Sequence, residues 1–339
     1  MAMYNVSPSN QSSSNTYWLE IVSDYLGDWE NVSTLPYNFF DGSAVVYNDE
    51  IHILSGYGNN TAHYKWSGTS WESISTLPYN LYYGCAVVYN NEIHILGGSG
   101  GYKNHYKWNG SSWSSVSTLP YNFVSGSAVV YNNEIYIMGS SQSSSYYKYF
   151  YKWDGSSWSK LTNIPYNFYN GCAVVYNNEI HVMGTQNTDS TNTRKHYKWN
   201  GSSWSSVSTL PYNFYNGSAI VVNDEIHILG GEFTSTTQKL HYKWNGSNWI
   251  SVSELPYYFC YGNAVLCNKS IHILGSYQSA EHYSIFYGNA VQGYVKQGTN
   301  IYLPISSSPV TNNLQPITDG YKATSDGEVK INLLEELEV

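Results

Sequence analysis

The sequence predicts an all-β fold: a six-bladed β-propeller that an N-terminal strand closes, followed by a small C-terminal β extension. Three observations support this prediction: a sequence motif repeated six times, four strand-like segments in each repeat, and a last repeat that lacks one strand. The motif consists of Leu-Pro-Tyr or Ile-Pro-Tyr, an aromatic-rich turn and a Gly-x-Ala strand. Its copies begin at Leu35, Leu77, Leu119, Ile164, Leu210 and Leu255. Steps of 42 to 46 residues, each holding one strand-rich unit, are typical of blades arranged around an axis.

Each repeat contains four predicted strands, which residues 77–118 illustrate. Small and β-branched residues favour an inner strand, and alternating residues favour a second strand that ends at a di-glycine. A variable loop leads to a third strand, and Asn109-Gly110 turns the chain into a fourth. The four strands span residues 84–89, 92–96, 105–108 and a segment that begins near Trp113. Four antiparallel strands make one propeller blade.

The last repeat lacks its fourth strand, because no tryptophan follows residues 282–286 at the expected place. The N-terminal segment Asp28–Thr34 matches Ser112–Thr118, which belongs to the fourth strand of the second repeat. We therefore expect this segment to form the outer strand of the sixth blade. That arrangement closes the ring and removes an exposed strand edge.

The repeat resembles the kelch family in two features. One is a di-glycine after the second strand, as in Gly97-Gly98 and Gly230-Gly231, and the other is a tyrosine separated by six residues from a tryptophan. The pairs are Tyr64/Trp71, Tyr106/Trp113, Tyr151/Trp158, Tyr197/Trp204 and Tyr242/Trp249. The di-glycine is altered to Ser55-Gly56, Gly139-Ser140, Gly184-Thr185 and Gly275-Ser276. The resemblance covers residues 29 to about 286, and it implies a six-bladed kelch-type propeller, a fold that often serves as a protein-interaction scaffold.

The sequence divides into three parts. The Ser/Asn-rich residues 1–16 favour a flexible arm, residues 17–287 the propeller, and residues 288–339 the extension. Within the extension, residues 295–305 favour a strand and residues 321–333 a hairpin. The extension resembles accessory modules of kelch-like proteins from bacteriophages and their bacterial hosts, which implies docking to a virion or a bacterial surface. The alternative is that it only covers one side of the propeller.

Composition restricts the possible partners. Charged residues make up only 12% of the chain, the net charge is −9, and Arg194 is the only arginine. Because nucleic acids and anionic membranes are bound through Lys and Arg, neither is an expected partner. No apolar run approaches the roughly 20 residues that span a bilayer, and the N-terminus lacks the features of a secretory signal. These observations leave a cytoplasmic or a virion-associated location open. The four cysteines do not form a disulfide pattern, because Cys85 and Cys172 take a small strand position that serine holds in other repeats.

Ten histidines recur on the second and third strands, and we interpret them as packing residues. In the third repeat both positions change together, to Tyr136 and Phe150. The numbering predicts that His52 lies directly opposite His63 and that Glu50 lies directly opposite Lys65. Such pairs, like the repeated tryptophans, stabilise blades. Two imidazoles without a third ligand make a poor metal site, so no metal or other cofactor is expected; opportunistic metal binding is the alternative.

The candidate ligand site lies on the face that carries the interblade loops and the loops between second and third strands. In each interblade loop the last two positions vary between repeats. The varying residues that we expect to surround the central mouth and to bind a ligand are Phe40, Asp41, Tyr82, Tyr83, Tyr169, Asn170, Tyr215, Asn216 and Tyr261. Aromatic faces stack on sugar rings and Asn or Asp groups match hydroxyls, although the same residue types also form protein-binding surfaces. We interpret the site as one for a neutral, hydroxyl-rich cell-surface glycan; the alternatives are a protein partner and aromatics that merely cap the blade ends.

We expect no enzymatic activity and no catalytic residue. Gly110–Trp113 resembles the tail of the sialidase Asp-box turn, but the preceding aspartate is absent and one arginine cannot form a three-arginine clamp. A copper oxidase of the galactose oxidase kind needs a Cys–Tyr crosslink and convergent loop ligands, whereas these histidines lie on strands. A glycoside hydrolase needs two carboxylates about 5–10 Å apart, and the inner strands carry none.

Overall fold

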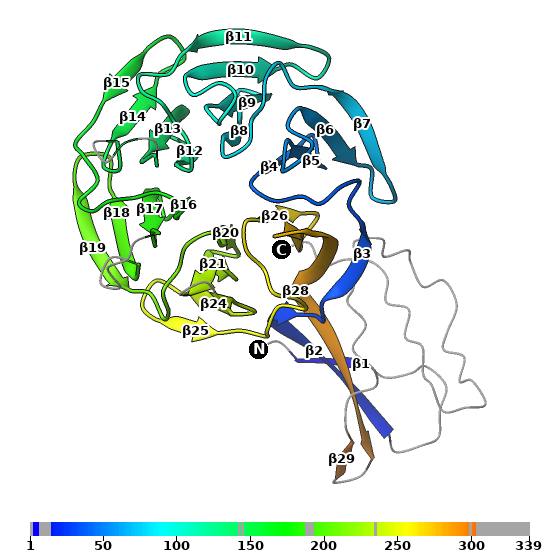
Figure 1. Ribbon diagram of the computed structural model, residues 1–339. Helices are drawn as coiled ribbons and strands as arrows, with labels where there is room; N and C mark the ends of the chain where they lie inside the picture. The colour runs from blue at the N-terminus through cyan, green and yellow to red at the C-terminus, as the bar shows by residue number, and fades with distance from the viewer. Residues whose placement is uncertain are drawn as a thin grey trace. The chain divides into compact units, whose positions relative to one another are not determined.

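The computed structural model describes residues 3–6, 15–141, 143, 146–186, 193–233, 236–297 and 300–302, which fall into two compact units. The larger unit, Trp29–Ile285, consists of six four-stranded antiparallel sheets around a central axis (Figure 1). It confirms the prediction of an all-β, six-bladed propeller. Within the described residues, no helix is long and apolar enough to cross a membrane.

The first five blades are each built from consecutive segments, from an inner strand near the axis to an outer strand at the rim (Figure 1). The first blade contains β4 (Ser43–Tyr47), β5 (Glu50–Leu54), β6 (Ala62–Trp66) and β7 (Trp71–Thr76). The second contains β8 (Cys85–Tyr89), β9 (Glu92–Leu96), β10 (Asn104–Trp108) and β11 (Trp113–Thr118). The third contains β12 (Ser127–Tyr131), β13 (Glu134–Met138), β14 (Phe150–Trp153) and β15 (Trp158–Lys160).

The fourth and fifth blades follow the same plan. The fourth contains β16 (Cys172–Tyr176), β17 (Glu179–Met183), β18 (Lys195–Trp199) and β19 (Trp204–Thr209). The fifth contains β20 (Ser218–Val222), β21 (Glu225–Leu229), β24 (His241–Trp244) and β25 (Trp249–Ser251). A short hairpin of β22 (Glu232–Phe233) and β23 (Thr236–Thr237) lies in the loop between its second and third strands.

The sixth blade joins the two ends of the propeller sequence. It contains β26 (Asn263–Cys267), β27 (Ser270–Ser276), the first part of β28 (Ser279–Gln297) and β3 (Glu30–Thr34). β3 pairs antiparallel with β28, so that Thr34 lies opposite Glu281 and Glu30 opposite Ser284. The predicted closing strand is therefore present.

The second unit, taken by itself, is an antiparallel sheet around the remainder of β28. β2 (Asn15–Leu26) pairs with residues 287–297 of β28, and β1 (Met3–Val6) pairs with β2. Strands thus occupy the described part of the segment expected as an arm, residues 1–16. Where one strand was expected over residues 295–305, β28 ends at Gln297 and pairs with β29 (Asn300–Tyr302). The hairpin expected over residues 321–333 lies outside the described residues.

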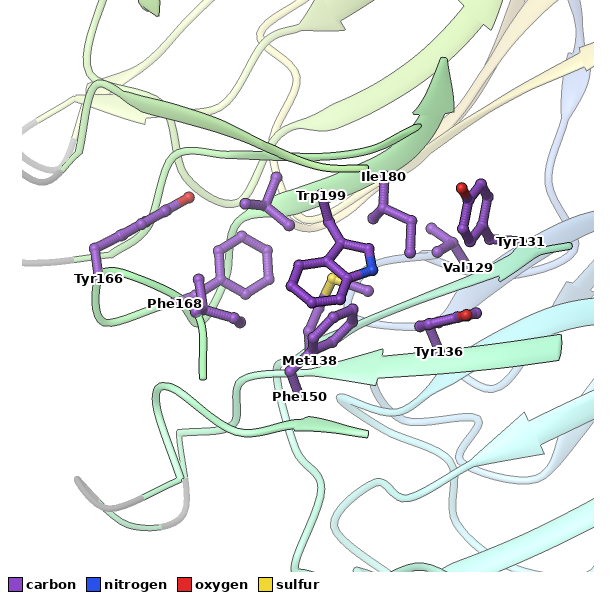
Figure 2. Close-up of a cluster of buried hydrophobic side chains, with 11 residues drawn as sticks. Val129, Tyr131, Tyr136, Met138, Phe150, Tyr166, Phe168, Ile180 and Trp199 are labelled. Atoms are coloured by element: carbon purple, nitrogen blue, oxygen red, sulfur yellow. The ribbon is translucent and has the colours of Figure 1, made fainter. Parts of the chain in front are cut away.

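The hydrophobic core of the propeller lies between neighbouring blades. Figure 2 shows the cluster where Tyr136, Met138 and Phe150 of the third blade meet Phe168 and Trp199 of the fourth. Each third-strand tryptophan is buried in this way, with 3 to 7% of its surface exposed. Burial of an aromatic side chain removes roughly 150–250 Å² from water, so these contacts hold adjacent blades together.

The histidines take part in the same contacts, although the predicted register is wrong by two residues. His52 lies opposite Lys65, and Leu54 lies opposite His63. The side chains nevertheless meet along the diagonal: His52 Nδ1 is 2.9 Å from His63 Nε2, and Lys65 Nζ is 2.8 Å from Glu50 Oε1. Long side chains reach a diagonal partner on the same face, so a two-residue shift preserves the pairing that the sequence indicated.

The histidine pairs extend into hydrogen-bond chains between blades. His63 Nδ1 lies 2.9 Å from Ser75 Oγ, which accepts a hydrogen bond of 3.1 Å from Trp113 Nε1 in the next blade. The same chain links the second blade to the third, the fourth to the fifth and the sixth to the first. In the third blade Phe150 takes the place of the histidine and packs edge-on against Trp199, as His63 packs against Trp108. The joint change to Tyr136 and Phe150 therefore replaces a polar interblade contact with an aromatic one.

In five of the six blades, close packing between blades favours glycine at the first position of the di-glycine. Gly184 has a φ of 67°, and a Cβ added there would overlap the carbonyl oxygen of Phe214 in the next blade. The same overlap occurs at Gly97, Gly139, Gly230 and Gly275. In the first blade Ser55 holds this first position, with a φ of 63°. The second position carries a side chain in three blades; Thr185, for example, uses its hydroxyl to accept a hydrogen bond from the Tyr169 amide. The departures from the kelch-like di-glycine in the third, fourth and sixth blades thus fall at the second position, whereas the first blade, with Ser55-Gly56, departs at the first.

Candidate ligand-binding face

The interblade loops are fixed by their repeated aromatic residues. In the loop before the fourth blade, Phe168 is fully buried and the Tyr166 hydroxyl donates a hydrogen bond of 3.1 Å to the Gly184 carbonyl. The corresponding phenylalanines or leucine are fully buried in all six loops. The tyrosine after proline and the residue two places on are therefore packing residues, which leaves the last two loop positions as candidates for contact with a ligand.

The last position of each loop belongs to a closed ring of main-chain hydrogen bonds. Its six members are Asp41, Tyr83, Ser125, Asn170, Asn216 and Tyr261. Each amide donates to the carbonyl of the same position in the preceding blade, with N···O distances of 2.6 to 2.9 Å. All six have φ between 53° and 63°. Together with the glycines that follow them, they line an axial pocket of about 150 Å³.

Two of the ring residues are strained. The left-handed region suits asparagine, which two of the six positions carry, but it is unfavourable for a bulky side chain. Tyr83 has a φ of 63° and Tyr261 a φ of 59°. Backbone strain of this kind concentrates at functional sites, so these two tyrosines mark one part of the ring as a candidate functional site.

Both tyrosines line a second pocket, which we call the aromatic pocket. It has a volume of about 270 Å³ and draws on the loops of the sixth, first and second blades. Its lining consists of Phe40, Asp41, Tyr57, Tyr82, Tyr83, Tyr261, Tyr277 and Gln278. Five of the nine sequence-predicted site residues are thus brought together.

The rings of the aromatic pocket contact one another while two of them stay open to solvent. Tyr57 stacks on Phe40 with ring centroids 4.9 Å apart and an angle of 19° between the planes, and Tyr277 lies 5.3 Å from Phe40 on a tilt of 59°. Phe40 itself is buried, whereas Tyr57 is 60% exposed and Tyr277 58% exposed. The buried ring therefore supports two tyrosines that can offer aromatic surface to a ligand.

One carboxylate lies among these rings. The Tyr82 hydroxyl lies 3.1 Å from Asp41 Oδ2 and 3.1 Å from the Tyr83 hydroxyl. Burial, the hydrogen bond with Tyr83 and the nearby Asp41 raise the pKa of Tyr82, and burial above all raises the pKa of Tyr83. Both phenols therefore stay neutral at physiological pH. Asp41 is the only ionisable carboxyl group in the lining, and no lysine or arginine belongs to it.

The other four predicted site residues lie outside the aromatic pocket, on the loops before the fourth and fifth blades. Tyr169 stacks on Tyr147 with centroids 4.7 Å apart. Asn170 donates to Gln186 Oε1, and Asn216 is buried; both line the axial pocket. Tyr215 is half-buried and, like Tyr169, lines neither pocket.

Sequence reasoning placed Tyr277 only in a variable loop and did not single out Tyr57 or Gln278. The sequence does contain a signal for two of these residues. Tyr57 and Tyr277 occupy equivalent positions, directly after the altered di-glycines Ser55-Gly56 and Gly275-Ser276. Their amides donate to the carbonyls of Phe40 and Cys260, just as Ser99 donates to Tyr82. A comparison of the repeats at this one position would have found two tyrosines where the other blades carry polar residues.

The solved structure described as "Structure of YjhT" resembles this chain with a TM-score of 0.63. The match covers 77% of this chain and 96% of that one, at 16% sequence identity. At this identity the likeness concerns the fold alone. No protein-family model matches the chain, and no curated protein matches it.

Proposed function

We propose that this propeller is a non-enzymatic binding protein that recognises a cell-surface glycan on its interblade-loop face. The observation that supports this proposal is the aromatic pocket, where tyrosines from three blades gather around Asp41. Its volume of about 270 Å³ lies near the lower end of the roughly 300–1,000 Å³ of small-molecule sites. This size suits a single sugar ring whose C–H face lies on Tyr57 or Tyr277.

Two further parts of the proposal rest on the sequence. The di-glycine and the Tyr/Trp pairs favour a propeller of the kelch type, and the resemblance of residues 288–339 to accessory modules favours attachment to a virion or a bacterial surface. A non-enzymatic role is consistent with the single carboxyl group in the pocket lining, because hydrolysis of a glycosidic bond usually needs two. Co-sedimentation of the full chain with purified virions or cell envelopes tests the attachment.

The glycan proposal is tested by binding of the purified protein to an array of glycans and bacterial polysaccharides. Tyr57→Ala and Tyr277→Ala each remove an exposed ring from the pocket, and we expect each to weaken binding by about three- to tenfold. Tyr258→Ala is the matched control, because Tyr258 is 63% exposed and is not part of the pocket lining.

The control variant should bind like the wild type. If the folded wild type binds no glycan, the glycan proposal fails and the kelch-type alternative, a protein-interaction scaffold, takes its place. An alanine scan of the exposed loops against a captured protein partner would then show a small number of dominant residues.

A further inference from the structure

The aromatic pocket combines two groups that both attract a cation. Its lining contains six aromatic rings, whose faces carry partial negative charge, and one carboxyl group, Asp41. None of its lining residues is a lysine or an arginine that would repel a positive ligand. The chain as a whole carries a net charge of −9, which raises the local concentration of cations.

The position of the carboxylate is specific to this pocket. Of the six ring positions, the other five carry Tyr83, Ser125, Asn170, Asn216 and Tyr261, so Asp41 is the only acidic residue in the ring. Asp41 lines the axial pocket together with the other five ring positions, and it also lines the aromatic pocket, where the six aromatic side chains gather. The acidic group and the aromatic cluster therefore coincide in one place.

From this coincidence we infer that the pocket takes a sugar carrying a positively charged ammonium group, and prefers it to the neutral sugar of the same shape. The inference rests on the proposed glycan function and names its ligand class. The ammonium group would lie between the Asp41 carboxylate and the open rings of Tyr57 and Tyr277. The sugar ring would occupy the rest of the pocket, with the Tyr82 and Tyr83 hydroxyls and the Gln278 amide available for hydrogen bonds.

The test compares two oligosaccharides that share a backbone and differ in charge. N-trimethyl chitosan tetramer carries ammonium groups whose charge does not depend on pH, and chitin tetramer carries neutral N-acetyl groups. Isothermal titration at pH 7.5 measures both affinities. We expect the cationic tetramer to bind about tenfold tighter or more, as fits one cation–π contact together with one charge pair.

Asp41→Asn removes the charge with little change of structure, since asparagine already occupies the equivalent ring positions 170 and 216 with the same backbone conformation. We expect this variant to lose the preference for the cationic tetramer, so that its affinities for the two tetramers differ by less than about twofold. Asp154→Asn is the matched control. It makes the same change of charge in an exposed turn where other blades carry Asn109, Asn200 and Asn245, and it should keep the preference.

Three outcomes separate the inference from the proposed function. Equal or tighter binding of the neutral tetramer, with loss in Tyr57→Ala, overturns the inference and leaves the glycan function intact. The same preference in Asp41→Asn as in wild type also overturns the inference, because the attraction then comes from the overall charge. Absence of binding to both tetramers and to every other array sugar, by a folded protein, overturns both.

Discussion

Acid should unfold this propeller through its buried histidines. Five histidine pairs are hydrogen-bonded between second and third strands. Burial lowers the pKa of each histidine from its usual 6.5, to about 4 at His94 and to about 3 at His105, for example. At His94 the nearby Glu92 opposes this shift and Lys107 adds to it.

The sign and size of the effect follow from proton linkage. The folded state keeps the imidazoles neutral, whereas the unfolded chain protonates them below about pH 6.5. Stability is therefore fully present above pH 6.5 and falls as the pH drops toward the folded-state pKa values. A histidine with a folded pKa of about 4 loses about 2 kcal/mol by pH 5. Because all ten paired histidines carry a lowered pKa, their combined loss is comparable with the roughly 5–15 kcal/mol by which domains are stable. We expect the free energy of unfolding to fall steeply as the pH drops below about 6.

The assay is urea unfolding at a series of pH values from 7.5 to 6, followed by tryptophan fluorescence. The double variant His94→Tyr/His105→Phe copies the pair Tyr136 and Phe150 that the third blade uses at the same positions. Because it removes two titrating groups, it should lower the loss of unfolding free energy between pH 7.5 and pH 6 by about 2 kcal/mol. The reasoning is refuted if wild type and variant lose the same free energy over this range, or if the wild type is equally stable at pH 7.5 and pH 6.

Three other changes probe separate features. In urea unfolding, Gly184→Ala should destabilise the propeller by about 3 kcal/mol or more, because the added Cβ meets the Phe214 carbonyl. The control Gly68→Ala, which has a positive φ but open space around it, should cost about 1 kcal/mol, and equal effects would contradict the interblade clash. Tyr261→Asn should weaken glycan binding but leave the free energy of unfolding within about 1 kcal/mol of wild type or raise it, because it removes the strain of a tyrosine with left-handed backbone. A larger loss of stability would contradict strain at this position. Cys85 and Cys172 should resist iodoacetamide at pH 8 until the protein unfolds, since burial raises the pKa of each thiol to about 12; rapid native-state alkylation at either residue, detected by mass spectrometry, would contradict this.

The sequence predicts much of the fold because each blade repeats the same strands and the same packing residues. The closing strand β3 could be found by matching one segment to its equivalents, and the packing role of Phe168 follows from its recurrence. The register was wrong by two residues because a constant pairing pattern fits any even shift that keeps side chains on one face. Only the backbone pairing of His52 with Lys65 decides between the alternatives.

The candidate site could be predicted only in part. Interblade positions such as Tyr82 and Tyr261 are visible as variation within a repeat, and the pocket includes them. The contribution of Tyr57 and Tyr277 depends on which blades are neighbours across the closing point of the ring, where residues distant in sequence become adjacent. The strands β1 and β2 were missed because residues 1–16 were judged by their polar composition, although residues 17–26 are rich in the aromatic and β-branched residues that favour strands.

The closed ring of amide hydrogen bonds has a consequence for how binding specificity can change. Its six bonds use only main-chain groups, so the scaffold requires of each member nothing beyond tolerance of a left-handed backbone. Aspartate, tyrosine, serine and asparagine already meet this requirement in one molecule. Each position can therefore be exchanged separately, by mutation in nature or by design, without a compensating change in the adjacent blades. The central mouth thus presents six independently variable side chains on a constant backbone. A new ligand could be selected by substituting these side chains one at a time.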